Sequence, residues 1–387
     1  MRSVRLVYVF PMFLTLFLLG LEETSSAEKL GCDNAYSCIG MVIDSGDPVL
    51  VQMGDEMSSM VSAKQAGTMV KPTAGPIANV ARLLSRENAG LSIVPSDMLL
   101  YTARSQNARL RLAEERLRFI MTIGRKVVHV IARKNVRRLE DLDGKRVVMG
   151  PDNTAIWVVS NNLLHMHNVA PAAKIQLKPP AGIAAVLSSE ADAVFVVGDA
   201  PMGIINELGA SQSSQPYGSE VKNLHLLQIV LPPSASEYRP VTVRYPGFAE
   251  DVATVAILPT LVSYDFTHKS TPYFKQRCAQ LGRIGSTVRN RLQELRDTGH
   301  RQWQATTWEL EAGNWEKDGC FFSERGEEVR EAQRILNLLG YSVGPVDGIL
   351  GPRTTAGIRS YQADQNLTQN GTVNARLMSS LRRVSNQ

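Results

Sequence analysis

Short apolar runs alternate with helix-like segments through the middle of the chain, from about residue 67 to 265. The runs are rich in Val and Ile and are apolar on both faces, which predicts strands buried on both sides of a mostly parallel sheet. Sheets of this kind bind ligands at the carboxyl ends of their strands. The runs are LSIV at 91, VVHVIA at 127, RVVM at 146, AVFVV at 193, LLQIVL at 226 and TVAIL at 254, and the helices between them include 77–86, 157–167 and 201–208.

The pattern changes beyond residue 272. Residues 272–312 are helical in pattern and more polar, and the tryptophans that begin at Trp303 are expected to pack in a core. The charged segment 323–328 predicts a linker. From Val329 onward, apolar positions recur on one helix face, and a turn-rich stretch and two further helical patterns follow. We therefore expect a separate unit of three short helices over 329–384.

The N-terminus has the pattern of a secretory signal peptide, residues 1–27. A basic start, MRSVR, precedes an apolar stretch and the small-residue site EETSSA, so cleavage is expected after Ala27. An uncleaved membrane anchor is the alternative, but Pro11 interrupts the apolar run, and the run is shorter than the roughly 20 residues that a spanning helix needs. We expect export to the periplasm.

Export lets the four cysteines form disulfides. Cys32 and Cys38 are close enough in sequence to close a small loop, and Cys278 with Cys320 would join the end of the main domain. Four cysteines allow three connectivities, so this pairing is one of three. No CxxC or CxxH spacing supports a zinc site instead.

Charge and motifs exclude several function classes. The net charge of +5 is small beside 42 basic and 37 acidic residues, and no interleaving of arginine with aromatic residues indicates a nucleic-acid partner. Hydrolase, zincin and nucleotide-binding motifs are absent from the sequence, so we expect no enzyme and no cofactor. The HMH of residues 165–167 and the DLDGK at 141 do not have metal-site spacing, and no metal is expected.

Polar loops at the expected strand ends are the positive signal. They are KPTAGPIAN at 71, PSDM at 95, GPDNTA at 150 and GDAP at 198. Each follows an apolar run or precedes a helix, where backbone N–H groups and the positive helix end face a ligand. Four such loops predict a cleft rather than four ordinary connections.

Five aspartates fall in or beside these loops: Asp44, Asp47, Asp97, Asp152 and Asp199. If several line one cleft, unpaired carboxylates disfavour an anionic ligand and favour an ammonium group. The alternative is that they cap helices and face water.

The segments in their order resemble the TAXI family of TRAP transporter receptors, which are type II periplasmic solute-binding proteins. The resemblance is carried by PTAGPIANVARLLSRENAGLSIVPSDM, VHVIARKNVRRLEDLDGKRVVMGPDNTA, ADAVFVVGDAPMGIINEL and YPGFAEDVATVAILPTLVS, and covers roughly residues 65–265. It implies a domain over 28–322 with two α/β lobes, one of about 40–130 and 236–322 and the other of about 131–235. Hinge strands would let the lobes close over a small organic acid or amino acid for delivery to the membrane subunits of a TRAP transporter.

The resemblance also implies which residues contact the solute. Three places depart from the family pattern: IDSGDP at 43–48 has few glycines, Pro76 follows Gly75 where the family usually has a serine, and GPDNTA at 150 is poorer in small residues. A degenerate cleft is therefore an alternative. The implied ligand-binding residues are Thr73, Gly75, Asn79, Ser96, Asp97, Asn153, Thr154, Trp157, Gly198, Asp199 and Pro201.

The C-terminal unit resembles the three-helix peptidoglycan-binding domains found beside cell-wall enzymes. The residues of this unit that match the domain pattern either bind the wall or serve as turn and core positions of the fold. The positions that match are Asp347, Gly348, Gly351, Thr354, Tyr361 and Gln362.

Together these features predict an exported solute-binding protein without catalytic activity, held at the cell wall by its C-terminal unit. One alternative is a wall-associated scaffold with a degenerate cleft. The other is a peptidoglycan-remodelling enzyme, which needs convergent carboxylates or a nucleophile beside a base, and the sequence has no spaced motif for either.

Overall fold

The computed structural model describes residues 38–61, 67–86, 89–211, 218–248, 251–323, 325–346 and 350–385. The expected signal peptide, Cys32, Asp347 and Gly348 lie outside these residues. None of the helices within the described ranges combines the length and hydropathy that a membrane crossing requires.

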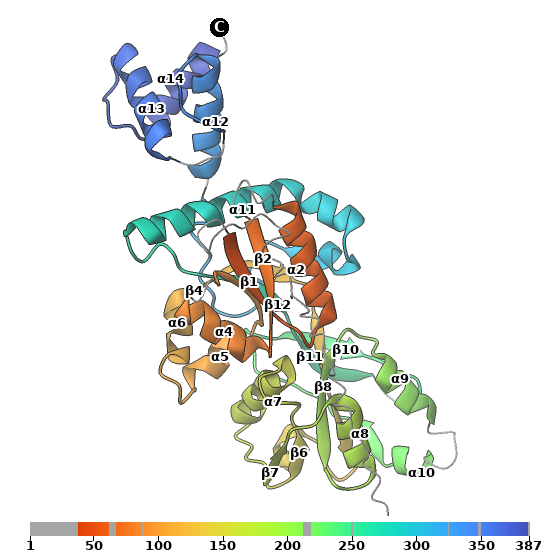
Figure 1. Ribbon diagram of the computed structural model, residues 1–387. Coiled ribbons are helices and arrows are strands. Elements are labelled where there is room, and N and C mark those ends of the chain that lie inside the picture. The colour runs from red at the N-terminus through yellow and green to blue at the C-terminus, as the bar shows by residue number, and fades with distance from the viewer. Residues whose placement is uncertain are drawn as a thin grey trace, which may run out of the picture.

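Two mixed sheets form the main body (Figure 1). The first has the strand order β13-β4-β12-β3-β1-β2, and the second has the order β10-β11-β5-β8-β6-β7 with β9 paired to β5. The first sheet consists of β1 (Cys38–Asp44), β2 (Gly67–Thr73), β3 (Leu91–Pro95), β4 (Leu117–Ile123), β12 (Pro259–Tyr264) and β13 (Thr306–Thr307). The second consists of β5 (Lys126–Arg133), β6 (Arg146–Val148), β7 (Ala173–Ile175), β8 (Ala193–Gly198), β9 (Leu224–Leu226), β10 (Arg239–Val243) and β11 (Val252–Ile257).

The chain passes between the sheets twice. The first passage is the two residues between β4 and β5, where Gly124 has φ +70° and so favours glycine. The return passage is the single residue Leu258 between β11 and β12. Each sheet with its helices is one lobe, and the two passages join the lobes. The expected two-lobed α/β fold with a small helical C-terminal unit is confirmed.

Two details of the sequence prediction were wrong. The sheets are mixed rather than mostly parallel, because β4 and β12 in the first sheet and β5, β9, β10 and β11 in the second pair antiparallel with neighbours. The lobe boundaries were also misplaced. β10 and β11, within residues 239–257, form a hairpin beside β5 and belong to the second lobe, which begins at Lys126 rather than residue 131.

Helices cover both faces of each sheet. Met53 and Met57 of α2 share one core with Leu281 and Ile284 of α11, and α4 packs on the opposite face of the first sheet through Val80. The two faces of the second sheet have separate cores. The helices of the main body are α2 (Pro48–Met60), α4 (Pro76–Ser85), α5 (Met98–Ala103), η1 (Leu110–Leu112), α6 (Ala113–Arg116), η2 (Leu139–Leu142), α7 (Ala155–Met166), α8 (Pro179–Leu187), α9 (Gly203–Ala210), α10 (Gly218–Val221), α11 (Pro272–Thr298) and η4 (Arg301–Ala305).

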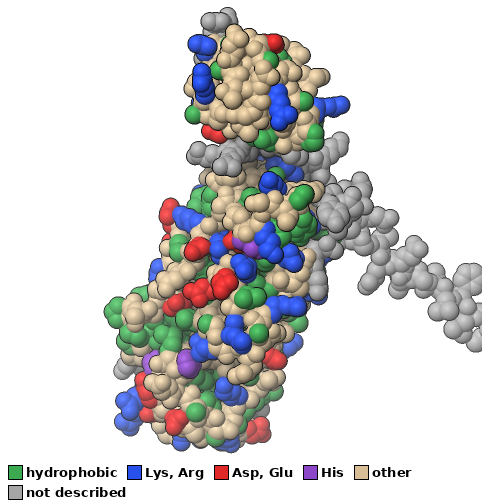
Figure 2. Space-filling view, turned by 90° about the vertical axis from the view of Figure 1, so that its left-hand side faces the viewer, with side chains coloured by type: hydrophobic (Ala, Val, Ile, Leu, Met, Phe, Trp, Pro, Cys, Tyr) green, Lys and Arg blue, Asp and Glu red, His purple; other side chains and the backbone are tan. Residues whose placement is uncertain are grey.

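The C-terminal unit consists of α12 (Arg325–Leu338), α13 (Pro352–Asp364) and α14 (Ala375–Ser385), which enclose a core of their own. It sits on α11, at the end of the molecule opposite the second lobe (Figure 1), and appears as a separate mass in the space-filling view (Figure 2). α12 begins at Arg325, inside the segment 323–328 that was expected to be a linker. The expected bond between Cys278 of α11 and Cys320 is present, and Cys38 is also disulfide-bonded.

The Cys278–Cys320 bond closes the end of the main body. It joins α11 to the segment that precedes the C-terminal unit, across a sequence separation of 42 residues. By loop-closure entropy, a bond across a loop of this length stabilises the folded chain by about 4 kcal/mol.

Candidate ligand-binding cleft

A cavity of about 350 Å³ lies between the lobes. It is formed by the carboxyl ends of β1 and β3 in the first lobe, and by the end of β8 and the segments after β6 and β7 in the second. Both passages between the lobes border it. This is where open α/β sheets bind ligands. Three of the four predicted polar loops contribute lining residues, through Pro76, Pro95 and Thr154, whereas the GDAP loop at 198 contributes none. Its apolar lining includes Leu50, Pro76, Ile93, Val94, Pro95, Ile156, Val197, Ile257 and Pro259, and its charged lining is Asp44, Asp47, Lys126 and Lys178.

Asp44 is one of two carboxylates that line the cavity. It ends β1, and its Oδ1 accepts the Gly46 N–H at 2.8 Å. Partial burial raises the pKa of this carboxyl, the Gly46 hydrogen bond opposes that effect, and the nearby charge of Asp47 raises the pKa further. Within the described residues Asp44 has no ion-pair partner, so a cationic group in the cavity would relieve its desolvation.

Lys126 bridges the two lobes. Antiparallel pairing of β5 with β8 sets Val127 opposite Gly198, so the next position along brings Lys126 beside Asp199. The Lys126 Nζ is 3.4 Å from an Asp199 oxygen and 3.2 Å from an oxygen of Asp47, the N-cap residue of α2. Gln302 of η4 donates to both Asp199 carboxylate oxygens, at 2.9 and 3.0 Å. These contacts, which we call the Lys126 bridge, neutralise two of the five aspartates that were considered.

Asn153 connects the second lobe to the amino end of α4. Helix α4 has Gly75 at its N-cap and so lacks a side-chain cap of its own. The Asn153 Oδ1 accepts the Ala78 N–H at 3.1 Å and supplies that cap. Gly75 has φ +141°, and a Cβ there would lie 2.0 Å from the Asn153 carbonyl oxygen, so no other residue allows this approach. The helix end that was expected to face a ligand is thus occupied by the protein itself.

Three of the expected contact residues make buried structural hydrogen bonds: Thr73 and Asn79 do so within the first lobe, and Ser96 bonds the segments that flank the β10–β11 hairpin. Thr73 and Asn79 are buried and hydrogen-bond each other, and Asn79 also donates to the Ile93 carbonyl at 3.3 Å. Ser96 donates to the Glu237 carbonyl at 2.7 Å and accepts the N–H of Leu258 at 3.1 Å. These side chains fix the strand ends that form the cavity, and none of them lines it.

Asp97 lies at a buried seam between α5 of the first lobe and α7 of the second. Asn162 donates to its Oδ2 at 2.8 Å, and the Tyr238 hydroxyl donates to the same atom at 2.8 Å. Its Oδ1 is buried and has no hydrogen-bond partner among the residues that the structure describes. Burial raises the pKa of Asp97 to about 6, although the two hydrogen bonds act in the opposite direction. Asp97 therefore holds the lobes together and is not exposed to a solute.

The remaining predicted residues have mixed positions. Thr154 lines the cavity and N-caps α7 by accepting the Trp157 N–H at 3.3 Å. Trp157 lies at the seam, where its Nε1–H donates to the Tyr101 hydroxyl at 3.3 Å. Gly198 ends β8, and Pro201, after a cis peptide bond, is exposed. Asp152 is exposed and accepts the N–H of its neighbour, as the helix-cap and solvent alternative expected.

The sequence interpretation missed Lys126 and Lys178. Lys126 is the first residue of the strand that enters the second lobe, and Lys178 precedes the proline pair that begins α8. A charged residue at the point where the chain changes lobes is a usable signal, because that point borders the cleft. No local signal marks Lys178.

Three of the predicted wall-binding positions form the interior of the C-terminal unit. Thr354 donates to the Val343 carbonyl at 2.9 Å, and the Tyr361 hydroxyl is 2.9 Å from the Ser380 hydroxyl. Gln362 accepts the Gly371 N–H at 2.9 Å and donates to the Asn370 side chain. All three are buried. Gly351 is the N-cap residue of α13.

The family that matches most of the main body is described as NMT1-like, and its match spans residues 48–273. The chain belongs to the NMT1-like family. Residues 325–381 match a peptidoglycan-binding domain family. The first match lies inside the predicted solute-binding domain of residues 28–322 and includes the region of the TAXI resemblance, residues 65–265. The second includes α12, α13 and most of α14.

Solved structures of binding proteins are similar to this chain at low identity. PhnD1 from Prochlorococcus marinus in complex with methylphosphonate is 15% identical, with a TM-score of 0.39 over 78% of this chain and 99% of that one. A phosphonate-transporter binding protein from Pseudomonas aeruginosa is 11% identical, with a TM-score of 0.37 over 90% and 99%. A histidine-bound ABC-transporter binding protein from Streptococcus pneumoniae is 10% identical, with a TM-score of 0.37 over 75% and 99%.

Proposed function

We propose that this NMT1-like protein is an exported, non-catalytic solute-binding protein that closes on a small organic acid or amino acid and is held at the cell wall by its C-terminal unit. The cavity between the lobes, at the carboxyl ends of strands from both sheets, is the observation that carries this proposal. The peptidoglycan-binding match supports a periplasmic, wall-associated position.

The chemistry of the cavity favours an amino acid over a dicarboxylic acid. Asp44 offers a carboxylate and Lys178 a cation, and neither has an ion pair with any described residue. The wall between these two charges is mostly apolar. A solute with an ammonium group, a carboxylate and an aliphatic side chain matches all three features, whereas a dicarboxylate would meet repulsion at Asp44.

Closure would use the hinge between the lobes. A ligand stabilises the closed state by the contacts that it makes only when both lobes surround it. In this protein the Lys126 bridge and the Asn153 cap already join the two lobes. The contacts of a bound solute would therefore add to contacts between the lobes that the chain makes without it. A bound solute would then be delivered to the membrane subunits of a TRAP-type carrier or be sensed by a partner at the membrane.

The same lobe contacts favour one second candidate, a wall-associated scaffold with a degenerate cleft. Asn153 occupies the amino end of α4, which the transport hypothesis assigned to the ligand. In a scaffold, these contacts would hold the lobes closed permanently.

A thermal-shift screen of the mature chain against amino acids and dicarboxylates separates the two candidates. A ligand at one hundred times its dissociation constant stabilises the protein by about 2.7 kcal/mol, which gives a measurable rise in Tm. We expect aliphatic amino acids to give this rise, and Asp44→Asn to abolish it. Asp152→Asn is the matched control, because Asp152 is exposed and bonds only its own loop.

The wall-binding half of the proposal has its own test. We expect the full chain to co-sediment with purified peptidoglycan whether or not a solute is bound. A flat thermal-shift screen with intact wall binding supports the scaffold. Failure to co-sediment contradicts the wall attachment for either candidate.

A further inference from the structure

A second concave site lies on the second lobe, away from the cleft. This groove of about 760 Å³ lies between the segment after β5, the segment that carries β9, and the residues around Phe248. β5 connects the two sites, since Lys126 at its start borders the cleft and Lys134 just after its end lines the groove. At about 3.3 Å per residue, the ends of this strand are roughly 23 Å apart. A ligand in the groove therefore does not touch the solute cavity.

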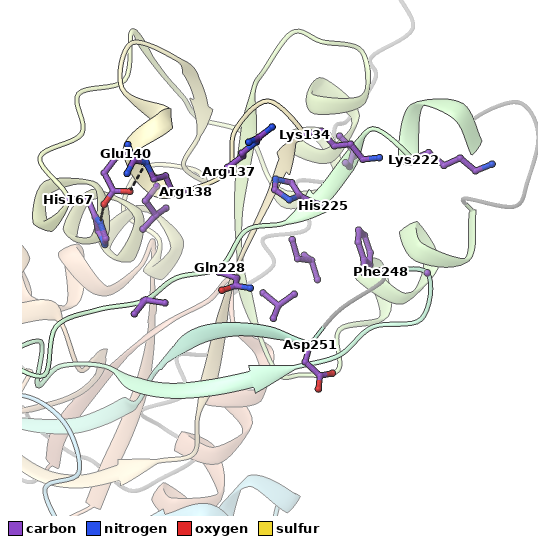
Figure 3. Close-up of a pocket in the computed structure, with 16 residues that line it drawn as sticks. Lys134, Arg137, Arg138, Glu140, His167, Lys222, His225, Gln228, Phe248 and Asp251 are labelled. Atoms are coloured by element: carbon purple, nitrogen blue, oxygen red, sulfur yellow. Dashed lines mark hydrogen bonds and ion pairs between the residues drawn. The ribbon is translucent and has the colours of Figure 1, made fainter.

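Strand pairing brings two lysines together in this groove. β9 runs antiparallel to the end of β5 with Arg133 opposite Leu224, and the Lys134 N–H donates to the Asn223 carbonyl at 3.0 Å. Lys222 precedes Asn223 on the neighbouring segment, and both lysines line the groove. Figure 3 shows Lys134, Lys222 and His225 along the same wall, with Arg137 beside them. Like charges at such positions repel and lower stability unless an anion lies between them.

The carboxylates in the groove already have partners. Glu140 accepts from His167 Nδ1 at 2.7 Å and lies 4.0 Å from Arg138. Asp251 is 3.7 Å from Arg244. The other lining cations, Lys134, Arg137 and Lys222, form no ion pair with any residue in the described ranges. The groove thus holds three uncompensated positive charges from two separate segments.

The groove also has an apolar side. Phe248 lines it, together with Val252 and with Val230, whose side chain is 70% exposed. His225 is fixed by the 2.6 Å contact of its Nε2 with the Val136 carbonyl oxygen, so its ring forms part of a preformed wall. A ligand that fits has an anionic head for the cations and an organic part for the apolar side.

We infer that this groove binds a phosphate ester. A phosphoryl group carries about −1.5 to −2 charges and has three acceptor oxygens, so one group can pair with more than one of the cations that line the groove. A single carboxylate has one charge and two oxygens and therefore compensates fewer of them. The ester is either a soluble metabolite or the headgroup of an anionic phospholipid. The second lobe is at the end of the molecule opposite the C-terminal unit, so this site is in the lobe farther from the proposed wall attachment (Figure 1).

Calorimetric titration of the full mature chain with glycerol 3-phosphate tests the inference, with glycerol as the uncharged comparison. We expect binding of the phosphate ester alone, weakened at least tenfold in Lys134→Gln/Arg137→Gln. The matched control is Arg109→Gln/Lys275→Gln. It also removes two positive charges, at exposed positions of the first lobe far from the groove. Sedimentation with phosphatidylglycerol vesicles, compared with phosphatidylcholine vesicles, tests the lipid source.

Each outcome decides the inference. Binding of glycerol 3-phosphate that is lost only in the groove variant supports a soluble ester. Binding to phosphatidylglycerol vesicles alone, with the same loss, supports a headgroup. Equal loss in the control variant indicates a general charge effect and overturns the site, as does absence of binding to both probes. An unchanged Tm in the groove variant shows that it is folded, and the amino-acid screen reports separately on the cleft.

Discussion

The side chain of Asn153, in the second lobe, caps a helix of the first lobe by accepting the Ala78 N–H at 3.1 Å. Asn153 has φ +69°, a left-handed conformation that asparagine tolerates better than most residues. The loop is held there because Gly75 leaves room for the Asn153 backbone. One side chain thereby links the contact between the lobes to the stability of α4.

Asn153→Gly should destabilise the chain by about 1 kcal/mol, the usual value of an N-cap side chain. Glycine keeps the positive φ and removes only the amide. Without the cap, the lobes should also separate more readily, which increases the radius of gyration in X-ray scattering without solute. Asn168→Gly is the matched control, since Asn168 also has positive φ, at +55°, and is exposed. Equal urea midpoints for the two variants would contradict a role for the Asn153 side chain.

The sequence located the strands better than it located the site. Val- and Ile-rich runs predicted buried strands, because burial on both faces needs apolar residues at every position. Strand direction carries no such signal. Leu258 alone separates β11 from β12, so one apolar stretch serves both lobes and was assigned to the first.

Three of the four predicted loops line the cavity, but few of their predicted side chains reach it. Thr73 and Asp44 end neighbouring strands and are paired in the β1–β2 register, yet Asp44 lines the cavity and Thr73 points into the lobe. Whether a side chain at a strand end points into the cavity or into the lobe depends on how that strand end is rotated. The Lys126 bridge depends on the positions of both lobes, and residues 79 positions apart, such as Asp47 and Lys126, give no local pattern.

Lys126→Met should lower the free energy of unfolding by about 1–2 kcal/mol, between the values for an exposed and a fully buried ion pair. The lysine is 12% exposed, but its partners are 26% and 35% exposed, so water relieves part of the loss. Methionine keeps most of the side-chain length and removes the charge. The difference from the unsubstituted protein should shrink as salt is added, because screening weakens partly exposed pairs. Lys174→Met is the control, since Lys174 is exposed and bonds only the Asn161 amide, at 3.0 Å. A salt-independent loss would point to packing instead of charge.

Asp97 should make the protein less stable as the pH rises from about 4 to 6. Its pKa is raised to about 6 in the folded chain, against an ordinary value of 3.8. Between these values the folded chain holds a proton that the unfolded chain has released, so unfolding is favoured increasingly up to pH 6 and no further above it. The full effect is about 3 kcal/mol.

Asp97→Asn tests this assignment, because the amide has no charge to lose. We expect the difference in unfolding free energy between pH 4 and pH 7, measured by urea denaturation, to shrink by most of this amount. Asp152→Asn, at an exposed position of a cleft loop, should leave the difference unchanged. If Asp97→Asn keeps the full pH dependence, another group is responsible.

Tyr361→Phe distinguishes a structural from a wall-binding role for the pattern residues of the C-terminal unit. The Tyr361 hydroxyl is buried and 2.9 Å from the Ser380 hydroxyl, so its removal should destabilise the unit by about 1 kcal/mol. Because the ring stays in the core, peptidoglycan co-sedimentation well below the melting temperature should not change. Tyr341→Phe is the comparison: its hydroxyl donates to Asp364 at 2.7 Å in an exposed pair that raises its pKa to about 12, and removing it should cost less stability. Loss of wall binding by a folded Tyr361→Phe protein would instead make this residue part of the binding surface.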